Sequence, residues 1–419
     1  MAGVSMTVVR VAGILVLTAI CLSCGETYRP VATPIIPSLP NPGFSHIALF
    51  ITGNGVDHPG ASTSIDVSGD TAISRSTVGL MPVNAVLVAG NRVYVVNNVD
   101  DTVSTFSPSS PTPVITISLP AGSVPSFVGT AETDLVFVTN FGSNTVSAIS
   151  TTSNVLVSPV YGIPVGTHPV SLAETPNDQK LYVANQGTNG AGGSVTSINP
   201  VDRSVNPAIA NATWISPVSV VARSDSNRAY VLDQGSGLVS AIDTASDTVV
   251  NTVSVGVGAN FMLYDSTRNR LYIVNPVANT VTYLAAATDA LPAVVINVVN
   301  PVSVATLPDG SRTYISSASA SGGNVTSRVT VINAADGSLR TTIPLTTVPQ
   351  VCASNPSELS MAAAADSTRV YVGNCDAGNV ADIQTINDTL LLDMPAPQSA
   401  TFKDGVPLPQ NPVFVVAGP

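Results

Sequence analysis

Histidine is the side chain that most often takes up or releases a proton near neutral pH, and this sequence has three: His46, His58 and His168. None stands at a metal-ligand spacing such as H-E-x-x-H. The sequence also lacks a G-x-S-x-G nucleophile turn and a glycine-rich phosphate loop. Each histidine is therefore interpreted as a turn or surface residue, and no metal, cofactor or catalytic residue is predicted.

Basic residues form one repeated pattern. Six of the 15 lysines and arginines stand two positions before a short aromatic-aliphatic run, and an acidic residue usually precedes them in the same turn. These six are Arg92, Lys180, Arg228, Arg270, Arg312 and Arg369. They are candidates for a ring of charge that attracts an anionic partner. The alternative, which the repetition favours, is a turn-local ion pair in every repeat, and such exposed pairs contribute little stability.

Trp214 and Glu174 are two further candidates for contact with a ligand or a partner. Trp214 is the only tryptophan, and it precedes Pro217 in a predicted connection. An exposed tryptophan there would suit contact with a glycan or a protein, whereas burial between sheets is the more common use of a large aromatic residue. Glu174 is a solitary charge at the end of the apolar run Val170–Ala173.

These residues belong to elements that repeat along the chain. The run Val93-Tyr94-Val95-Val96-Asn97 returns six times in edited form, at intervals of 42 to 57 residues. Its aromatic anchors are Tyr94, Phe137, Tyr182, Tyr230, Tyr272, Tyr314 and Tyr371. A proline usually stands 12 to 15 positions before the anchor, and a second apolar pair follows it. Each unit reads as four short strands, and four-stranded units of about 40–45 residues are β-propeller blades.

The Tyr-Val-x-Asn…Val-Ser-x-Ile…Pro pattern resembles the YVTN-type β-propeller repeats of bacterial surface and periplasmic proteins. Phe137-Val-Thr-Asn140 differs from the name-giving tetrapeptide only by Phe for Tyr. The resemblance covers residues 45–419 and implies one all-β domain, a β-propeller of four-stranded antiparallel blades. It implies no particular function, because such propellers have many roles.

The repeat count predicts eight blades. Seven anchors are clear, and Phe50 occupies the aromatic position of a degraded unit before them. Prolines interrupt Ile36–Gly43, so no first strand precedes Phe50. The orphan run Pro412-Val-Phe-Val-Val416 is expected to complete that blade and to close the ring non-covalently. Seven blades with an irregular cap is the alternative.

The N-terminal segment reads as a targeting signal. Arg10 precedes the apolar run Val11–Leu22, which ends at Ser23-Cys24-Gly25. Residues 1–23 are predicted to be a lipoprotein-type signal peptide, and residues 24–44 a lipidated Cys24 followed by a Pro-rich tether. The propeller would then be anchored to a membrane on the extracytoplasmic side, at the outer membrane or cell surface. With a plain secretory signal, the alternative, it would be periplasmic or secreted.

Two further cysteines lie near the C-terminus. Cys352 precedes the first predicted strand of the last blade, and Cys375 follows its second strand. Those ends are neighbours in an antiparallel hairpin, so a disulfide is geometrically reasonable. The alternatives are a free thiol pair or a metal site, and no histidine stands nearby to support the latter.

Composition limits the function. Charged residues make up only 10% of the chain, against about 25% in a typical globular protein, and the net charge of −11 argues against nucleic acid. The predicted function is a monomeric, non-enzymatic module that binds a protein, glycan or small molecule. The alternative is a propeller enzyme of lactonase or quinoprotein-dehydrogenase type. Such enzymes need charged groups converging on the central channel, where the predicted innermost strands offer almost none besides Glu174. A purely structural envelope component is a third reading.

Overall fold

The structure is a computed structural model that describes residues 47–53, 58–88, 92–130, 134–209, 212–288, 291–352, 359–396, 402–403, 406–407 and 411–417. The predicted signal peptide, Cys24, the tether and His46 lie outside these residues. Within the described ranges, no helix has the length and apolar character needed to cross a membrane.

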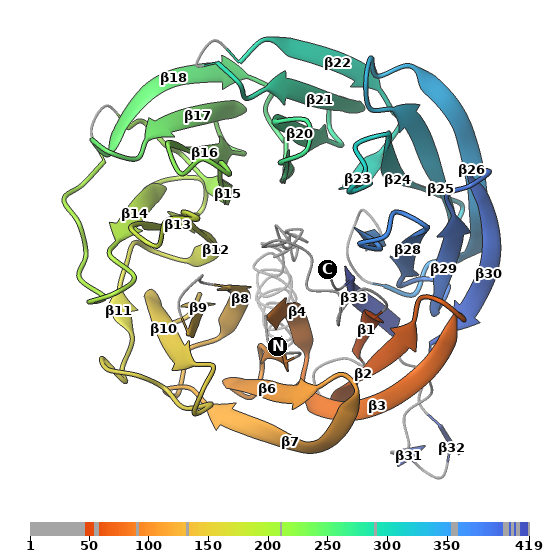
Figure 1. Ribbon diagram of the computed structural model, residues 1–419, viewed down its shortest axis with the longest axis horizontal. Coiled ribbons are helices and arrows are strands. Elements are labelled where there is room, and N and C mark those ends of the chain that lie inside the picture. The colour runs from red at the N-terminus through yellow and green to blue at the C-terminus, as the bar shows by residue number, and fades with distance from the viewer. Residues whose placement is uncertain are drawn as a thin grey trace, which may run out of the picture.

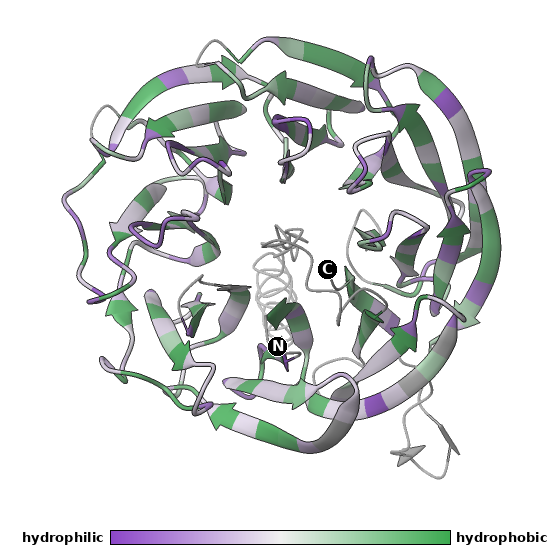
Figure 2. Cartoon of the chain, viewed as in Figure 1, coloured by the Kyte–Doolittle hydropathy of each residue, from purple (hydrophilic) through white to green (hydrophobic). Residues whose placement is uncertain are grey.

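The chain folds into a ring of eight β-sheets, each forming one blade of a propeller (Figure 1). Seven of the sheets have four antiparallel strands and blade 4 has three. This confirms the predicted all-β propeller with eight blades and excludes the seven-bladed alternative. Apolar residues follow the strands, and polar residues gather in the turns between them (Figure 2).

The strands of the first four blades have the following bounds. Blade 1 contains β33 (Asn411–Ala417), β1 (Ile47–Gly53), β2 (Pro59–Asp66) and β3 (Thr71–Leu80), from the innermost strand outward. Blade 2 contains β4 (Pro82–Val88), β5 (Arg92–Asn97), β6 (Thr102–Ser107) and β7 (Ser110–Ser118). Blade 3 contains β8 (Pro125–Thr130), β9 (Leu135–Asn140), β10 (Thr145–Ser150) and β11 (Ile163–Pro164). Blade 4 contains β12 (Pro169–Glu174), β13 (Leu181–Asn185) and β14 (Ser194–Ile198).

The other four blades are regular. Blade 5 contains β15 (Pro217–Ala222), β16 (Arg228–Asp233), β17 (Leu238–Asp243) and β18 (Thr248–Ser254). Blade 6 contains β19 (Phe261–Asp265), β20 (Arg270–Asn275), β21 (Thr280–Ala285) and β22 (Ala293–Asn297). Blade 7 contains β23 (Pro301–Thr306), β24 (Arg312–Ser321), β25 (Asn324–Asn333) and β26 (Leu339–Pro349). Blade 8 contains β27 (Leu359–Ala363), β28 (Arg369–Asn374), β29 (Asn379–Gln384) and β30 (Thr389–Pro395), and a small hairpin of β31 (Phe402–Lys403) and β32 (Val406–Pro407) follows.

The C-terminal strand closes the ring. β33 pairs antiparallel with β1, from Ala48 opposite Ala417 to Gly53 opposite Asn411. It supplies the innermost strand that the N-terminal blade lacks, as the orphan run Pro412–Val416 predicted. Phe414 and Val415 are buried at this closure. The ring is therefore joined by hydrogen bonds and packing at blade 1.

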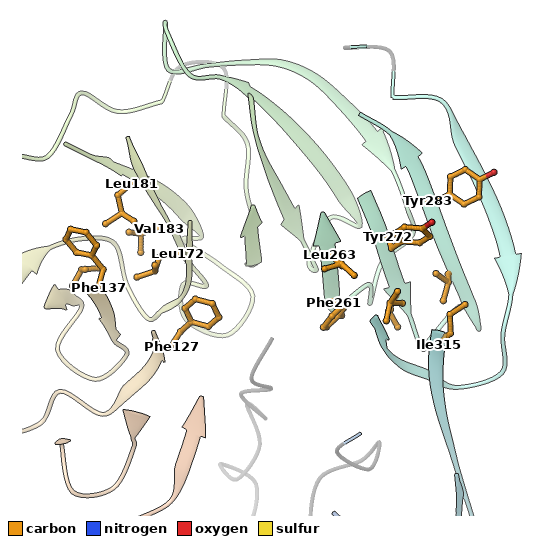
Figure 3. Packing of buried hydrophobic residues seen from close by; sticks show 14 of the residues in the cluster. Phe127, Phe137, Leu172, Leu181, Val183, Phe261, Leu263, Tyr272, Tyr283 and Ile315 are labelled. Carbon is orange, nitrogen blue, oxygen red and sulfur yellow. The ribbon is translucent and has the colours of Figure 1, made fainter. Parts of the chain in front are cut away.

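The repeated Tyr-Val run forms the second strand of each blade and is buried on both faces, because it lies between two neighbouring sheets. All seven aromatic anchors are at most 1% exposed. Between blades 3 and 4, Phe127 and Phe137 pack with Leu172 and Val183 in one apolar cluster (Figure 3). Full burial of such a side chain contributes roughly 1.5–3 kcal/mol, so the second strands are a major source of stability.

Polar side chains join the innermost strands of adjacent blades. The Asn84 Oδ1 accepts the Val128 N–H at 3.0 Å, and the Ser171 Oγ accepts the Val220 N–H at 3.2 Å. Three further serines bond to the backbone of the next blade: Ser126 and Ser303 donate to the carbonyls of Pro169 and Leu359, and Ser360 accepts the Val415 N–H. Innermost strands have backbone groups that no further strand pairs, and these side chains satisfy some of them.

Trp214 occupies the irregular outer part of blade 4, where the other blades have a fourth strand. Its side chain is half-buried and packs with an apolar cluster that includes Ile209 and Ile242. Its Nε1 donates to the Ser240 Oγ at 3.3 Å. The tryptophan therefore packs between blades 4 and 5 while keeping part of its surface exposed.

Cys352 and Cys375 form the predicted disulfide, with Cα atoms 6.1 Å apart. The bond links the segment that enters blade 8 to the turn that follows β28. In the same place, the Asp376 Oδ1 accepts the backbone N–H groups of Val351 and Cys352. The disulfide and the Asp376 carboxylate together hold Val351 and Cys352 against the turn that follows β28.

Candidate functional site

The two ends of the ring are built from different turns. At one end, called the mouth end here, each innermost strand begins and each second strand turns into the third. At the other, called the base end, the first strand turns into the second and the third into the fourth. Chemistry-bearing side chains of different kinds gather at these two ends.

One hydrogen bond recurs at the mouth end. The N–H that follows the Tyr-Val-x-Asn segment donates to the carbonyl of the residue before the innermost strand. This bond joins Asn98 to Met81 at 3.0 Å, Phe141 to Val124 at 3.1 Å, Gln186 to His168 at 2.8 Å and Ala318 to Asn300 at 3.2 Å. The four accepting residues have positive φ angles between 45° and 55°. Few non-glycine residues adopt this conformation, so the turns position these residues at a cost in backbone strain.

His168 is the member of this set that carries an ionisable ring. Its backbone N–H donates to the Asn144 Oδ1 at 2.8 Å. Its ring stacks on Phe141 with the ring centroids 4.2 Å apart and the planes inclined by 8°. Its Nδ1 lies 2.8 Å from the carbonyl oxygen of Gly187. Contacts from three sides therefore fix both the position and the orientation of the imidazole.

The contact with Gly187 also fixes the tautomer. A carbonyl oxygen only accepts hydrogen bonds, so Nδ1 is the donor and carries the proton in the neutral ring. The lone pair then resides on Nε2, to which no described residue makes a hydrogen bond. A half-exposed imidazole held in this way has the arrangement of a general base. The sequence placed His168 correctly in a turn, but it could not show these contacts.

Acidic side chains at the mouth end accept hydrogen bonds from backbone N–H groups. Asp101 accepts the N–H groups of Gly122 and Val124 at 2.7 and 2.6 Å, and Asp100 accepts that of Leu80 at 3.1 Å. Asp233 accepts two more, from Ile215 and Ser216. Among the described residues, no group of three or more His, Cys, Asp or Glu side chains is arranged to hold a metal ion.

The predicted ring of basic residues lies at the base end, and its partners differ from the prediction. Lys180 Nζ lies 2.5 Å from the Asp247 Oδ2, in the next blade, and the Tyr182 hydroxyl donates to the other oxygen of that carboxylate at 2.6 Å. Burial and Asp247 together raise the pKa of Tyr182. The anchor tyrosine and the basic residue therefore bind a carboxylate of the next blade, rather than forming a pair within one turn. This arrangement of three side chains is called a latch here.

The same latch recurs with variations. Arg312 and Tyr314 of blade 7 bind Asp388 of blade 8 at 2.6 and 2.5 Å. Arg369 and Tyr371 of blade 8 approach Asp70 of blade 1, each at 3.3 Å. The side chains of these two arginines are less than one quarter exposed, so most of the ring is already engaged within the protein.

The remaining three basic residues of the ring differ from this latch in their surroundings. Arg228 pairs with Asp243 of its own blade at 2.7 Å. Arg270 donates to the carbonyls of Ala334 and Ala335 in blade 7, and it lies over the Tyr283 ring. Arg92 is half-buried at the start of β5, two residues before Tyr94, whose hydroxyl donates to the Asn154 Oδ1 at 2.8 Å.

Glu174 ends the innermost strand of blade 4 at the base end, opposite Leu181. Its side chain is half-buried. It therefore lies at the opposite end of the blade from His168, and the structure does not bring the two together.

No protein family model matches the chain, and no curated protein matches it. Solved propeller structures do resemble it. AztD of Citrobacter koseri aligns with a TM-score of 0.61 and 12% identity, over 89% of this chain and 98% of that one. Candidate 6-phosphogluconolactonases of Bacteroides uniformis and Bacteroides fragilis align with TM-scores of 0.54 and 0.50 and identities of 14% and 15%, over 88% and 90% of this chain and 99% of each of those. At such identities the likeness shows the fold alone.

These comparisons correct the prediction that the chain is not an enzyme. Propellers that align along nearly their whole length are named as candidate 6-phosphogluconolactonases, so this architecture is compatible with catalysis. That prediction depends on the lack of charge in the innermost strands. Those strands use Ser and Asn to join neighbouring blades, and the half-buried imidazole of His168 lies in a turn at the mouth end instead. Uncharged inner strands are therefore no argument against an active site.

Proposed function

We propose that this chain is a propeller hydrolase of the lactonase type, with His168 as its general base. One observation carries the proposal. Gly187, Asn144 and Phe141 hold the imidazole in place, and no described residue makes a hydrogen bond to its Nε2. The propellers named as candidate 6-phosphogluconolactonases support the choice of lactones as the substrate class. The repeat pattern supports membership of the YVTN-type propellers.

Lactone hydrolysis needs a base close to the carbonyl carbon. Nε2 of His168 would take a proton from a water molecule as the water oxygen bonds to that carbon. The ester C–O bond of the ring then breaks, the leaving oxygen receives the proton, and an open hydroxy acid results. Phe141 keeps the imidazole plane in place, and the Nδ1–H···O bond to Gly187 stabilises the imidazolium while it exists.

Replacing His168 by Asn is the direct test. Asn keeps a side-chain donor near Gly187 and tolerates positive φ, and Asn300 occupies the equivalent turn of blade 7 in the natural chain. The fold is therefore expected to survive while the base is lost. We expect kcat/KM for lactone hydrolysis to fall about 10²- to 10⁴-fold. A pH-indicator assay with γ- and δ-lactones, including glucono-δ-lactone with and without a 6-phosphate, measures it.

His58→Asn is the matched control, because His58 is half-buried beside β2 and lies outside the candidate site. Its activity and Tm should equal those of the natural chain. Hydrolysis of no lactone in the panel by the natural chain would refute the proposal. Undiminished activity in His168→Asn would refute the role of His168 and leave a lactonase with another site.

We also propose that the propeller is anchored to the cell envelope through a lipid on Cys24. The support is the run Val11–Leu22 followed by Ser23-Cys24-Gly25. Replacing Cys24 by Ser is expected to move the protein from the membrane fraction to the soluble fraction. Detergent phase partitioning and mass measurement of the N-terminal peptide test this. An unchanged distribution, with no acyl mass on Cys24, would favour a plain secretory signal.

A further inference from the structure

The junction between blade 8 and blade 1, called the seam here, is where the chain closes on itself. Apolar residues of both blades pack there, among them Phe50, Ile65, Tyr371 and Val380. At its base end, the Arg369 guanidinium and the Tyr371 hydroxyl approach the Asp70 carboxylate in the turn after β2, each at 3.3 Å. The seam thus uses the same kind of latch as other junctions.

The seam has one carboxylate more than the corresponding junction between blades 4 and 5. There, one cation, Lys180, meets one carboxylate, Asp247, and Ser197 lies opposite the anchor Tyr182 on the third strand. In blade 8 the residue opposite the anchor Tyr371 is Asp382. One cation, Arg369, therefore faces two carboxylates.

Asp382 is fully buried, at 0% exposed, and no N–H group or hydroxyl of the described residues donates a hydrogen bond to its carboxylate oxygens. The Arg369 Nε lies 3.5 Å from its Oδ2, which is an ion-pair distance without a hydrogen bond. Burial, followed by a side-chain hydrogen bond with Asp70 and the charge of Asp70, raises the pKa of Asp382 to about 7, although Arg369 acts in the opposite direction. A buried carboxyl group that faces a second carboxylate favours its neutral form, in which it can donate a hydrogen bond to that carboxylate.

The charged and titratable groups around Asp382 come from β28 and from blade 1, whereas β30 places an apolar residue opposite it. Arg369 and Tyr371 belong to β28, and burial, Asp382 and Asp70 raise the pKa of Tyr371, so its hydroxyl stays neutral. Asp70 belongs to blade 1. From β30, the residue opposite Asp382 is the apolar Leu392. The seam therefore contains one positive charge and two carboxyl groups in a mostly apolar junction.

We propose that the seam is a pH-sensitive closure, which is tight while the Asp70–Asp382 pair holds one proton and loosens when both carboxylates are ionised. With one proton, the charges of Arg369 and the pair balance; without it, a second negative charge is buried. An acidic group whose pKa is higher in the closed ring than in the open one stabilises closure fully below about pH 4. That stabilisation declines as the pH rises to about 7 and stays lost above it.

Amide hydrogen exchange of the whole protein, corrected for the intrinsic pH dependence of exchange, tests the proposal. We expect opening of β1, β2, β28 and β29 to increase by up to about 1,000-fold between pH 4 and pH 8, since one pKa unit corresponds to a tenfold change. Strands β13 and β16, at the junction of Lys180 with Asp247, serve as the internal reference. Their opening should change much less.

Asp382→Asn removes the ionisable group with little change of shape and should abolish the pH dependence of the seam. Asp70→Asn leaves Asp382 as the single carboxylate for Arg369 and should reduce the pH dependence without abolishing it, because burial still raises the pKa of Asp382. The test therefore survives if one variant fails to fold. Equal protection of the seam at both pH values in the natural chain would overturn the proposal. So would a pH dependence that is undiminished in either folded variant. The outcome does not depend on whether the chain hydrolyses lactones.

Discussion

A chain that ends at residue 410 is expected to lose most of its stability, because blade 1 then lacks its innermost strand. β33 pairs with β1 and also lies beside the innermost strands of blades 2 and 8, β4 and β27. Phe414, Val415 and Val416 are buried, and their burial contributes roughly 5 to 9 kcal/mol together. That is comparable to the whole free energy of unfolding of a typical domain, about 5–15 kcal/mol.

Thermal unfolding followed by circular dichroism, with binding of an apolar dye, measures this effect. A chain that ends at residue 417 keeps all of β33 and is the control for truncation itself. A peptide of residues 409–419 added to the short chain should restore part of the stability, because it can add a strand to the free edge of β1. A short chain with an unchanged Tm would show that β33 does not hold the ring closed.

Replacing Asp388 by Ala is expected to destabilise the protein by about 3–5 kcal/mol, because it leaves buried partners without their acceptor. The Asp388 carboxylate is 2% exposed and binds Arg312, Tyr314 and Arg340 of blade 7. Denaturant unfolding measures the loss. Asp336→Ala is the matched control, since Asp336 lies in an exposed turn and bonds only to Ser338. A similar small loss in both variants would contradict the assigned role of Asp388.

The pH dependence of this junction is opposite to that of the seam. Burial alone would raise the pKa of Asp388, but the hydrogen bonds from Tyr314, Arg340 and Arg312 outweigh it and hold the pKa below its ordinary value. Asp388 therefore stabilises the folded ring above about pH 4, and this stabilisation is lost as the pH falls. In Asp388→Ala that acid-dependent part of the unfolding curve should be missing.

The sequence predicted the features that depend on the alternation and spacing of residues along the chain. The Tyr-Val run is apolar on both faces, so its burial between two sheets followed from the alternation of side chains alone. The orphan run near Pro412 has no blade of its own, and the blade of Phe50 lacks a first strand. The two observations together predict that the C-terminal run completes the N-terminal blade. Cys352 and Cys375 could be paired because their places in a hairpin fixed their separation.

The sequence could not predict contacts that depend on the angle between neighbouring blades. Lys180 was assigned an acidic partner within its own turn, yet it binds Asp247, 67 residues away. The stacking of His168 on Phe141, the tautomer fixed by Gly187 and the burial of Asp382 depend in the same way on turns meeting in space. A single histidine before a proline gives no periodic signal, so the sequence predicts no more for His168 than a turn or surface position.

Closure by the last strand has a consequence for synthesis. β1, whose apolar residues Ala48 to Ile51 are buried in the finished ring, leaves the ribosome long before β33, the strand that covers its edge. Translation at about 5–20 residues per second leaves that edge unpaired for roughly 20 to 70 seconds. During this time the other blades can assemble one after another, while an exposed apolar strand edge is a template for pairing with other chains. Slower translation should therefore increase aggregation, and a chaperone that covers extended apolar segments should reduce it.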